Sequence, residues 1–148
     1  MKLFDNTFKY QLKNNIDSRG FFIEIFKLNQ ISKNSKINQV SHSLIKKNII
    51  KGWHFHKKQS QWNYLLKGKI RVFLIDKRKS SKTYKKIKSF IIDSNKHKIA
   101  YFFPPNIGHA YITYGNENHI IYGTSGYYDP QEEYKFEFNF NLLKKYKK

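Results

Sequence analysis

The chain has 148 residues, enough for one compact domain, and we predict a single domain over residues 1–148. Lys and Arg number 29 against 10 Asp and Glu, and this formal charge of +19 favours polyanions, nucleotides, phosphates or acidic membrane surfaces without choosing among them. No cysteine is present, which excludes disulfides and thiol chemistry. Because the sequence shows neither a signal-like apolar segment nor a membrane-spanning run, we expect a cytoplasmic protein without membrane contact.

Short apolar runs, most of them alternating with polar residues, recur along the chain. Phe, Tyr, Ile and Val are abundant in them, and these residues suit half-buried strands. In chain order the runs cover 20–26, 37–45, 49–56, 62–66, 69–76, 88–93, 99–103, 109–114, 119–128 and 134–140. Turn signals such as Lys67–Gly68 and Asp129–Pro130 separate them. Only residues 139–148 could form a short helix, so the sequence predicts an all-β barrel or sandwich.

The segment around residue 55 carries the first candidate site. His54 and His56 are one residue apart, so in a strand both side chains point to the same face. Gln61 follows five residues after His56, and Gly68 follows seven residues after Gln61. This spacing resembles the first motif of the cupin superfamily, in which a Glu occupies the place of Gln61.

A second segment completes the cupin pattern. Pro104, Asn106 and His109 have the spacing of the second cupin motif, in which a Gly occupies the place of Asn106. Together the two motifs imply a cupin double-stranded β-helix, which is a jelly-roll-like barrel, with the three histidines lining its interior. Three histidines in this paired spacing indicate a functional site rather than isolated structural residues.

Two kinds of chemistry fit His54, His56, Gln61 and His109. The four could surround one divalent metal ion, since imidazole suits Fe, Ni, Cu or Zn. Alternatively, a histidine could take a proton from a carbon next to a carbonyl, because imidazole titrates near neutral pH. The neutral Gln61 and the neighbouring lysines favour the second chemistry, so we expect no metal and no other cofactor. The other histidines are expected to be structural: His42, His97 and His119.

Several segments resemble one family of sugar-nucleotide enzymes. Residues 17–26 resemble its Arg-Gly-x-Phe-x-Glu segment, and residues 51–56 resemble Arg-Gly-Leu-His-Tyr-Gln. Residues 101–114 resemble Ile-Pro-x-Gly-Phe-Ala-His-Gly-Phe, and residues 119–133 resemble the closing Tyr and Tyr-x-Pro-x-x-Glu. The chain is thus similar to dTDP-4-dehydrorhamnose 3,5-epimerases. It also resembles the shorter dTDP-sugar 3,4-ketoisomerases, which carry Arg-Gly-x-His-Ala-His-Lys where this chain has residues 51–57. Both groups are metal-independent cupins.

The resemblance implies a set of catalytic residues. It makes His54 the base that removes a proton beside the C4 ketone and Tyr122 the acid that returns one. His56 becomes an accessory base, or orients the C4 oxygen, and Tyr127 is the nearest substitute for Tyr122. Two departures from the epimerases are expected: Gln61 stands where they carry a lysine, and their acidic partner of the base lies beyond the end of this chain.

The resemblance also implies substrate contacts. Arg19, Phe22 and Glu24 match residues that contact the nucleotide from the neighbouring subunit of a dimer, so we expect a homodimer. Further contacts to sugar or phosphate are expected from Gln39, Lys51, Gln61, His109 and Tyr127.

These expectations define one leading function. The protein is expected to isomerise a nucleotide-linked 4-keto-6-deoxyhexose, with dTDP as the nucleotide, by C3 or C5 epimerisation through an enolate. Such a reaction belongs to deoxysugar biosynthesis for cell-surface polysaccharide. The alternatives are a 3,4-ketoisomerase, a metal-dependent cupin enzyme, and a non-enzymatic cupin that binds sugar. The sequence shows no nucleic-acid-binding motif, so we expect no nucleic-acid partner.

Overall fold

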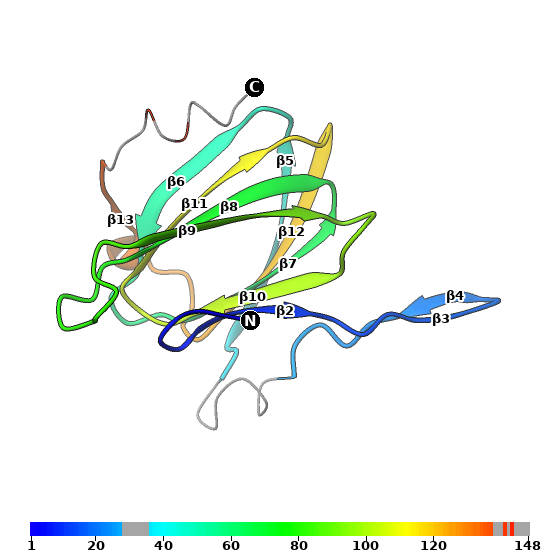
Figure 1. The fold of residues 1–148 in the computed structure, drawn as a ribbon, viewed down its shortest axis with the longest axis horizontal. Coiled ribbons are helices and arrows are strands. Elements are labelled where there is room, and N and C mark those ends of the chain that lie inside the picture. Colours follow the sequence, from blue (N-terminus) through cyan, green and yellow to red (C-terminus); the bar gives the residue numbers. More distant parts are fainter. Residues whose placement is uncertain (28–35, 138–140, 142, 144–148) are drawn as a thin grey trace.

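The structure is a computed structural model that describes residues 1–27, 36–137, 141 and 143. Among these residues the chain is almost entirely β-structure, as the alternating runs predicted (Figure 1). The elements in chain order are β1 (Lys2–Phe4), β2 (Thr7–Gln11), β3 (Asn15–Asp17), β4 (Gly20–Phe22), β5 (Gln39–Lys46), β6 (Ile50–Phe55), β7 (Gln61–Lys67), β8 (Lys69–Asp76), β9 (Ile87–Asp93), β10 (Ile99–Phe103), β11 (Ile107–Thr113), β12 (Glu117–Thr124), the 3₁₀ helix η1 (Pro130–Glu132) and β13 (Tyr134–Lys135).

Two antiparallel sheets form the body of the protein. The larger sheet has the order β1-β2-β10-β7-β12-β5 and the smaller one the order β13-β6-β11-β8-β9. Consecutive strands often belong to different sheets, which gives a jelly-roll-like connectivity. Among the described strands each sheet keeps free edges, so the predicted barrel is here an open pair of packed sheets. Strands β3 and β4 form a separate two-stranded arm that extends away from the body (Figure 1).

The prediction of strands was wrong near the N-terminal end of the chain. The run 20–26 forms a strand only over Gly20–Phe22, where it pairs with β3 in the arm. Strands β1 and β2 were not predicted, because their short polar-rich segments acquire strand structure only by pairing with each other and with β10. The possible helix over 139–148 and the end of the run 134–140 lie mostly outside the described residues.

Both faces of β8 are buried, which explains its nearly continuous apolar sequence. Ile70, Val72 and Leu74 point between the sheets into the main core. Phe73 and Ile75 point to the opposite side and join a second core cluster that includes Trp53, Ala110 and Leu143, with Phe136 packed against it. Phe136 and Leu143 therefore pack on the outer side of the smaller sheet.

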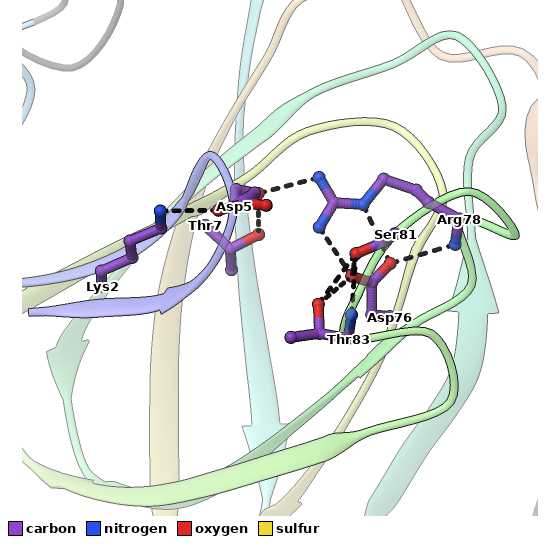
Figure 2. Close-up of polar contacts among 7 residues, drawn as sticks. All are labelled: Lys2, Asp5, Thr7, Asp76, Arg78, Ser81 and Thr83. Carbon is purple, nitrogen blue, oxygen red and sulfur yellow. Dashed lines mark hydrogen bonds and ion pairs between the residues drawn. The ribbon is translucent and has the colours of Figure 1, made fainter.

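A buried polar network fixes the loop between β8 and β9 (Figure 2). The Asp76 carboxylate is fully buried and accepts hydrogen bonds from Arg78 at 2.7–3.0 Å, from Ser81 at 2.7 Å and from Thr83 at 2.5 Å. Arg78 also donates to the backbone carbonyl of Asp5 at 2.8 Å and so joins the loop to the turn between β1 and β2. Burial alone would raise the pKa of Asp76, but these hydrogen bonds lower it well below its usual value.

Candidate functional site

A cavity of about 290 Å³ opens between the two sheets. Residues from both sheets line it, so neither sheet alone makes the site. Seven of the eleven residues predicted for the site meet here: Gln39, Lys51, His54, His56, Gln61, His109 and Tyr122. The two cupin-like motifs, far apart in sequence, thus form one site, as their spacing predicted.

A bulge in β6 brings Lys51 and His54 to the same side of the sheet. Opposite them on β11, Tyr111 faces Lys51 and His109 faces His54, so β6 has one more residue than its partner strand in this interval. Gly52 lies in the bulge with φ +113°, and a Cβ there would be 2.7 Å from the backbone of β11. With regular alternation, Lys51 and His54 would point to opposite faces; with the bulge, both line the cavity.

The imidazole of His54 is suited to accept a proton. Burial lowers the pKa of His54, and the nearby charges of Lys135 and Lys51 lower it further, whereas Glu133 raises it. The ring is therefore neutral at pH 7 and carries a free lone pair. Glu133 also lines the cavity and acts electrostatically on His54, so an acidic side chain lies near this imidazole although the sequence analysis named none. The Tyr-x-Pro-x-x-Glu resemblance could have indicated it, because its Glu falls on Glu133.

Two more histidine rings surround His54. The centroid of His109 lies 6.2 Å from that of His54 and 5.4 Å from that of His56. His109 stacks on Phe103 at 4.7 Å, and burial lowers its pKa to about 3, so it stays neutral. His56 Nδ1 donates a hydrogen bond to the carbonyl of Glu132 at 2.9 Å, since a carbonyl can only accept.

Tyr122 reaches the cavity from the other sheet. Its strand, β12, lies between β5 and β7 in the larger sheet, whereas His54 lies on β6 in the smaller one. The Tyr122 hydroxyl lies 2.9 Å from Ser43 Oγ and 3.0 Å from the Tyr111 hydroxyl. Burial raises the pKa of Tyr122, so its phenol keeps its proton at neutral pH. A neutral imidazole and a protonated phenol thus line one cavity from two different sheets.

Amide side chains line the rest of the cavity. Gln61 donates to Asn63 Oδ1 at 2.6 Å, and both side chains are buried. Gln39 donates to Ser41 at 2.9 Å and accepts from the backbone N–H of Tyr128 at 2.7 Å. Sequence reasoning did not assign site roles to Ser41 and Ser43, although both lie on the same face of β5 as Gln39.

Four of the predicted residues lie outside the cavity. Arg19 and Phe22 are exposed on the β3–β4 arm, and Arg19 pairs with Asp17 at 2.6 Å. Glu24 lies in a separate surface pocket beside Leu12 and pairs with Lys27 at 2.5 Å.

Tyr127 is not among the residues that line the cavity, whereas the neighbouring Tyr128 is. Both tyrosines are largely exposed, at 73% and 67%. The sequence carried a signal for this correction, because Tyr128 is the tyrosine that fits the Tyr-x-Pro-x-x-Glu resemblance together with Pro130.

In the described part of the chain, no group of three or more His, Cys, Asp or Glu side chains has an arrangement that could hold a metal ion. Nor does any helix in that part combine the length and the apolar character needed to cross a membrane.

Solved structures of sugar-nucleotide epimerases have the same fold. The dTDP-6-deoxy-D-glucose-3,5-epimerase of Legionella pneumophila, solved with dTDP-4-keto-L-rhamnose, superposes with a TM-score of 0.86 at 21% identity, over 96% of this chain and 78% of that one. A 3'-monoepimerase from Streptomyces bikiniensis, solved with dTDP-quinovose, gives a TM-score of 0.84 at 17% identity, over 92% and 72%. The open pair of sheets is therefore a cupin fold of the epimerase type.

Sequence comparison identifies the family. The sequence profile of the dTDP-4-dehydrorhamnose 3,5-epimerase family matches residues 3–144 of this chain. The dTDP-4-dehydrorhamnose 3,5-epimerase of Salmonella typhimurium is 27% identical over 79% of this chain and 67% of its own length. A spore coat polysaccharide biosynthesis protein of Bacillus subtilis is 28% identical over 82% and 80%. The chain belongs to the dTDP-4-dehydrorhamnose 3,5-epimerase family, whose members are isomerases.

Proposed function

We propose that the protein epimerises a dTDP-linked 4-keto-6-deoxyhexose at C3, C5 or both, in deoxysugar biosynthesis for a cell-surface polysaccharide. The observation that carries this proposal is the placement of His54 and Tyr122 on opposite sheets of one cavity. Epimerisation removes a proton from one face of a carbon and returns a proton to the other face. A base and an acid on facing walls are therefore the groups that the reaction requires.

The protonation states of the side chains support this chemistry. His54 is neutral, so it can take the proton from the carbon beside the C4 ketone while the electron pair moves onto the C4 oxygen as an enolate. The carboxylate of Glu133 then stabilises the imidazolium that forms. Tyr122 gives its proton to the opposite face of the carbon, and solvent resets both groups. The step moves only protons and one electron pair, and the side chains of His54, Glu133 and Tyr122 supply the groups for it, so the proposal includes no metal and no other cofactor.

Substrate binding is divided between the cavity and the β3–β4 arm. Within the cavity, His109 and the amides of Gln39 and Gln61 contact the sugar, and the exposed Lys51 at its edge contacts the diphosphate. Lysine keeps the charge that phosphate recognition needs but offers no bidentate pair of donors.

A homodimer explains the remaining predicted contacts. Arg19, Phe22 and Glu24 lie away from the cavity of their own chain. In the proposed homodimer the arm and the residues that follow it bring them to the nucleotide bound by the partner subunit. Size-exclusion chromatography with light scattering tests this point, and a monomer at micromolar concentration would contradict it. Because sugar nucleotides are built from the cytoplasmic nucleotide pool, we also propose a cytoplasmic location, which a fluorescent fusion tests.

A 3,4-ketoisomerase is the second candidate, and the pair formed by His54 and His56 favours it. Both histidines line the cavity, and a pair of bases could move protons between the C3 and C4 positions. The presence of Gln61 in place of an enolate-stabilising lysine supports the same candidate. Tyr122→Phe separates the two reactions, because an epimerase loses most turnover whereas a ketoisomerase that uses only histidines is affected mildly.

Proton NMR of the purified protein with dTDP-4-keto-6-deoxyglucose in heavy water tests the proposed function directly. We expect deuterium to enter at C3 or C5 with inversion at the same carbon. A 3-keto product would establish the ketoisomerase. Turnover that stops with a chelator and returns with a stoichiometric divalent metal, or a bound sugar nucleotide that never exchanges a proton, would overturn the metal-free epimerase.

A further inference from the structure

A chain of three hydroxyl groups runs through the wall of the cavity. Ser43 Oγ, Tyr122 Oη and Tyr111 Oη are joined at 2.9 Å and 3.0 Å, and each belongs to a different strand: β5, β12 and β11. Tyr111 is 7% exposed and comes from the smaller sheet, so this chain of hydroxyls bridges the two sheets. The epimerase motif that residues 101–114 resemble ends in Phe where this chain has Tyr111, so the phenol adds a hydroxyl that the motif lacks.

We propose that Tyr111 is a positioning residue that donates a hydrogen bond to Tyr122 and thereby directs the proton of Tyr122 into the cavity. A phenol oxygen has one proton to donate and two lone pairs that accept. If Tyr111 and Ser43 both donate to Tyr122, its lone pairs are occupied and its own proton must point elsewhere. The open direction is the cavity that Tyr122 lines, where the substrate carbon would lie.

The electrostatics of the two phenols agree with this direction of donation. Burial raises the pKa of Tyr111, and the neighbouring Tyr122 raises it further, so Tyr111 keeps the proton that it donates. The hydrogen bonds from Ser43 and Tyr111 oppose the effect of burial on Tyr122 and lower its pKa. Tyr122 is consequently a stronger acid with Tyr111 than it would be without it.

This inference rests on the proposed function, and isotope partitioning tests it. In Tyr111→Phe, His54 still removes the proton, but the weakened Tyr122 returns one more slowly. In heavy water the proton on the His54 imidazolium exchanges for deuterium from the solvent, and the enolate then reverts by taking that deuterium from His54. We expect kcat to fall about fivefold to tenfold, with KM changed less than about twofold, as for one lost hydrogen bond in the transition state. Deuterated but uninverted substrate should accumulate, a signature that a merely structural defect would not produce.

The partition ratio is the amount of deuterated, uninverted substrate relative to inverted product. The matched control is Tyr64→Phe, which removes a phenol hydroxyl from a buried tyrosine outside the cavity and should leave this ratio unchanged. In a Tyr122→Phe background, the Tyr111→Phe change should have no further effect on kcat. Equal partition ratios in wild type and Tyr111→Phe, or additive losses in the double variant, would overturn the positioning role and leave the epimerase intact.

A readout without turnover separates this inference from the proposed function. With tyrosine labelled by ¹³C at Cζ, the Tyr122 resonance at pH 7 reports on the hydrogen bonds to its oxygen. We expect it to shift in Tyr111→Phe and not in Tyr64→Phe. A Tyr122 resonance that does not move would overturn the hydrogen bond from Tyr111 whatever reaction the protein catalyses. Absence of deuterium exchange in the wild type, with the resonance shifted as expected, would overturn the epimerase alone.

Discussion

The protein contains two buried polar regions that differ in how well their groups are satisfied. Around Asp76, the carboxylate accepts five hydrogen bonds from Arg78, Ser81 and Thr83. In the cavity, by contrast, the His54 imidazole has no hydrogen-bond partner within the described part of the chain, and the His109 ring has one long contact of 3.4 Å to the Ile107 carbonyl. The Asp76 carboxylate is thus fully occupied by the protein's own donors, whereas the side chains of the cavity keep lone pairs and protons available for a ligand.

This difference separates a structural network from a reactive one. Buried polar groups cost free energy unless they are paired, so a fully paired cluster is compatible with stability alone. The titratable rings of the cavity are in their neutral forms, since burial lowers the pKa of His54 and His109 and raises that of Tyr122. Neutral forms cost less to bury than charged ones, and they are also the forms that exchange protons with a substrate.

The largest expected effect is on stability, in the network around Asp76. Asp76→Asn leaves the guanidinium of Arg78 without its charged partner, so the free energy of unfolding should fall by about 3–5 kcal/mol. Urea denaturation measures this loss, and turnover per folded molecule should be retained. Asp5→Asn is the control, because the Asp5 carboxylate pairs with Lys2 only at the surface. Equal stability of the two variants would refute the structural importance of the network.

The second effect is on turnover, in the cavity. His54→Asn should lower kcat by about a hundredfold or more, the usual contribution of a positioned general base, while the urea midpoint stays near that of the wild type. The exposed His97→Asn is the matched control and should be fully active. Wild-type turnover in His54→Asn would exclude His54 as the base.

A smaller effect should separate two neighbouring tyrosines. Tyr128→Ala removes part of the cavity wall and should weaken binding of dTDP by about tenfold, the loss of roughly one aromatic contact. Tyr127→Ala removes an exposed ring and should bind dTDP as the wild type does. Isothermal titration calorimetry measures both affinities, and the reverse ranking would restore the original assignment of Tyr127.

The smallest effect is on pH dependence. Because burial lowers the pKa of His54, kcat/KM should fall on the acid side only below about pH 6.5, the ordinary histidine value, as the base becomes protonated. Glu133 raises this pKa, so in Glu133→Gln the acid limb of the profile, which is the fall of kcat/KM at low pH, should move to still lower pH. Glu137→Gln, on the outer side of the smaller sheet, should leave the limb in place. A limb that moves upward in Glu133→Gln would contradict the proposed pairing with His54.

The sequence by itself determined the strand content of the body and the main members of the site. Alternation of apolar and polar residues encodes strands locally, and the spacing of His54, His56 and His109 placed them on inward faces of such strands. The resemblance to the epimerases added Tyr122. These features were predictable because each depends on a few neighbouring residues.

Only the tertiary structure decided how these residues meet. The bulge at Gly52 breaks the alternation that would separate Lys51 from His54, and it arises from pairing with β11. The contact of Tyr111 with Tyr122 joins strands of two different sheets, and the proximity of Glu133 to His54 depends on the path of the segment around η1. Local periodicity carries no information on such long-range contacts, because they are fixed by the packing of whole sheets and not by the residues next to them in the chain.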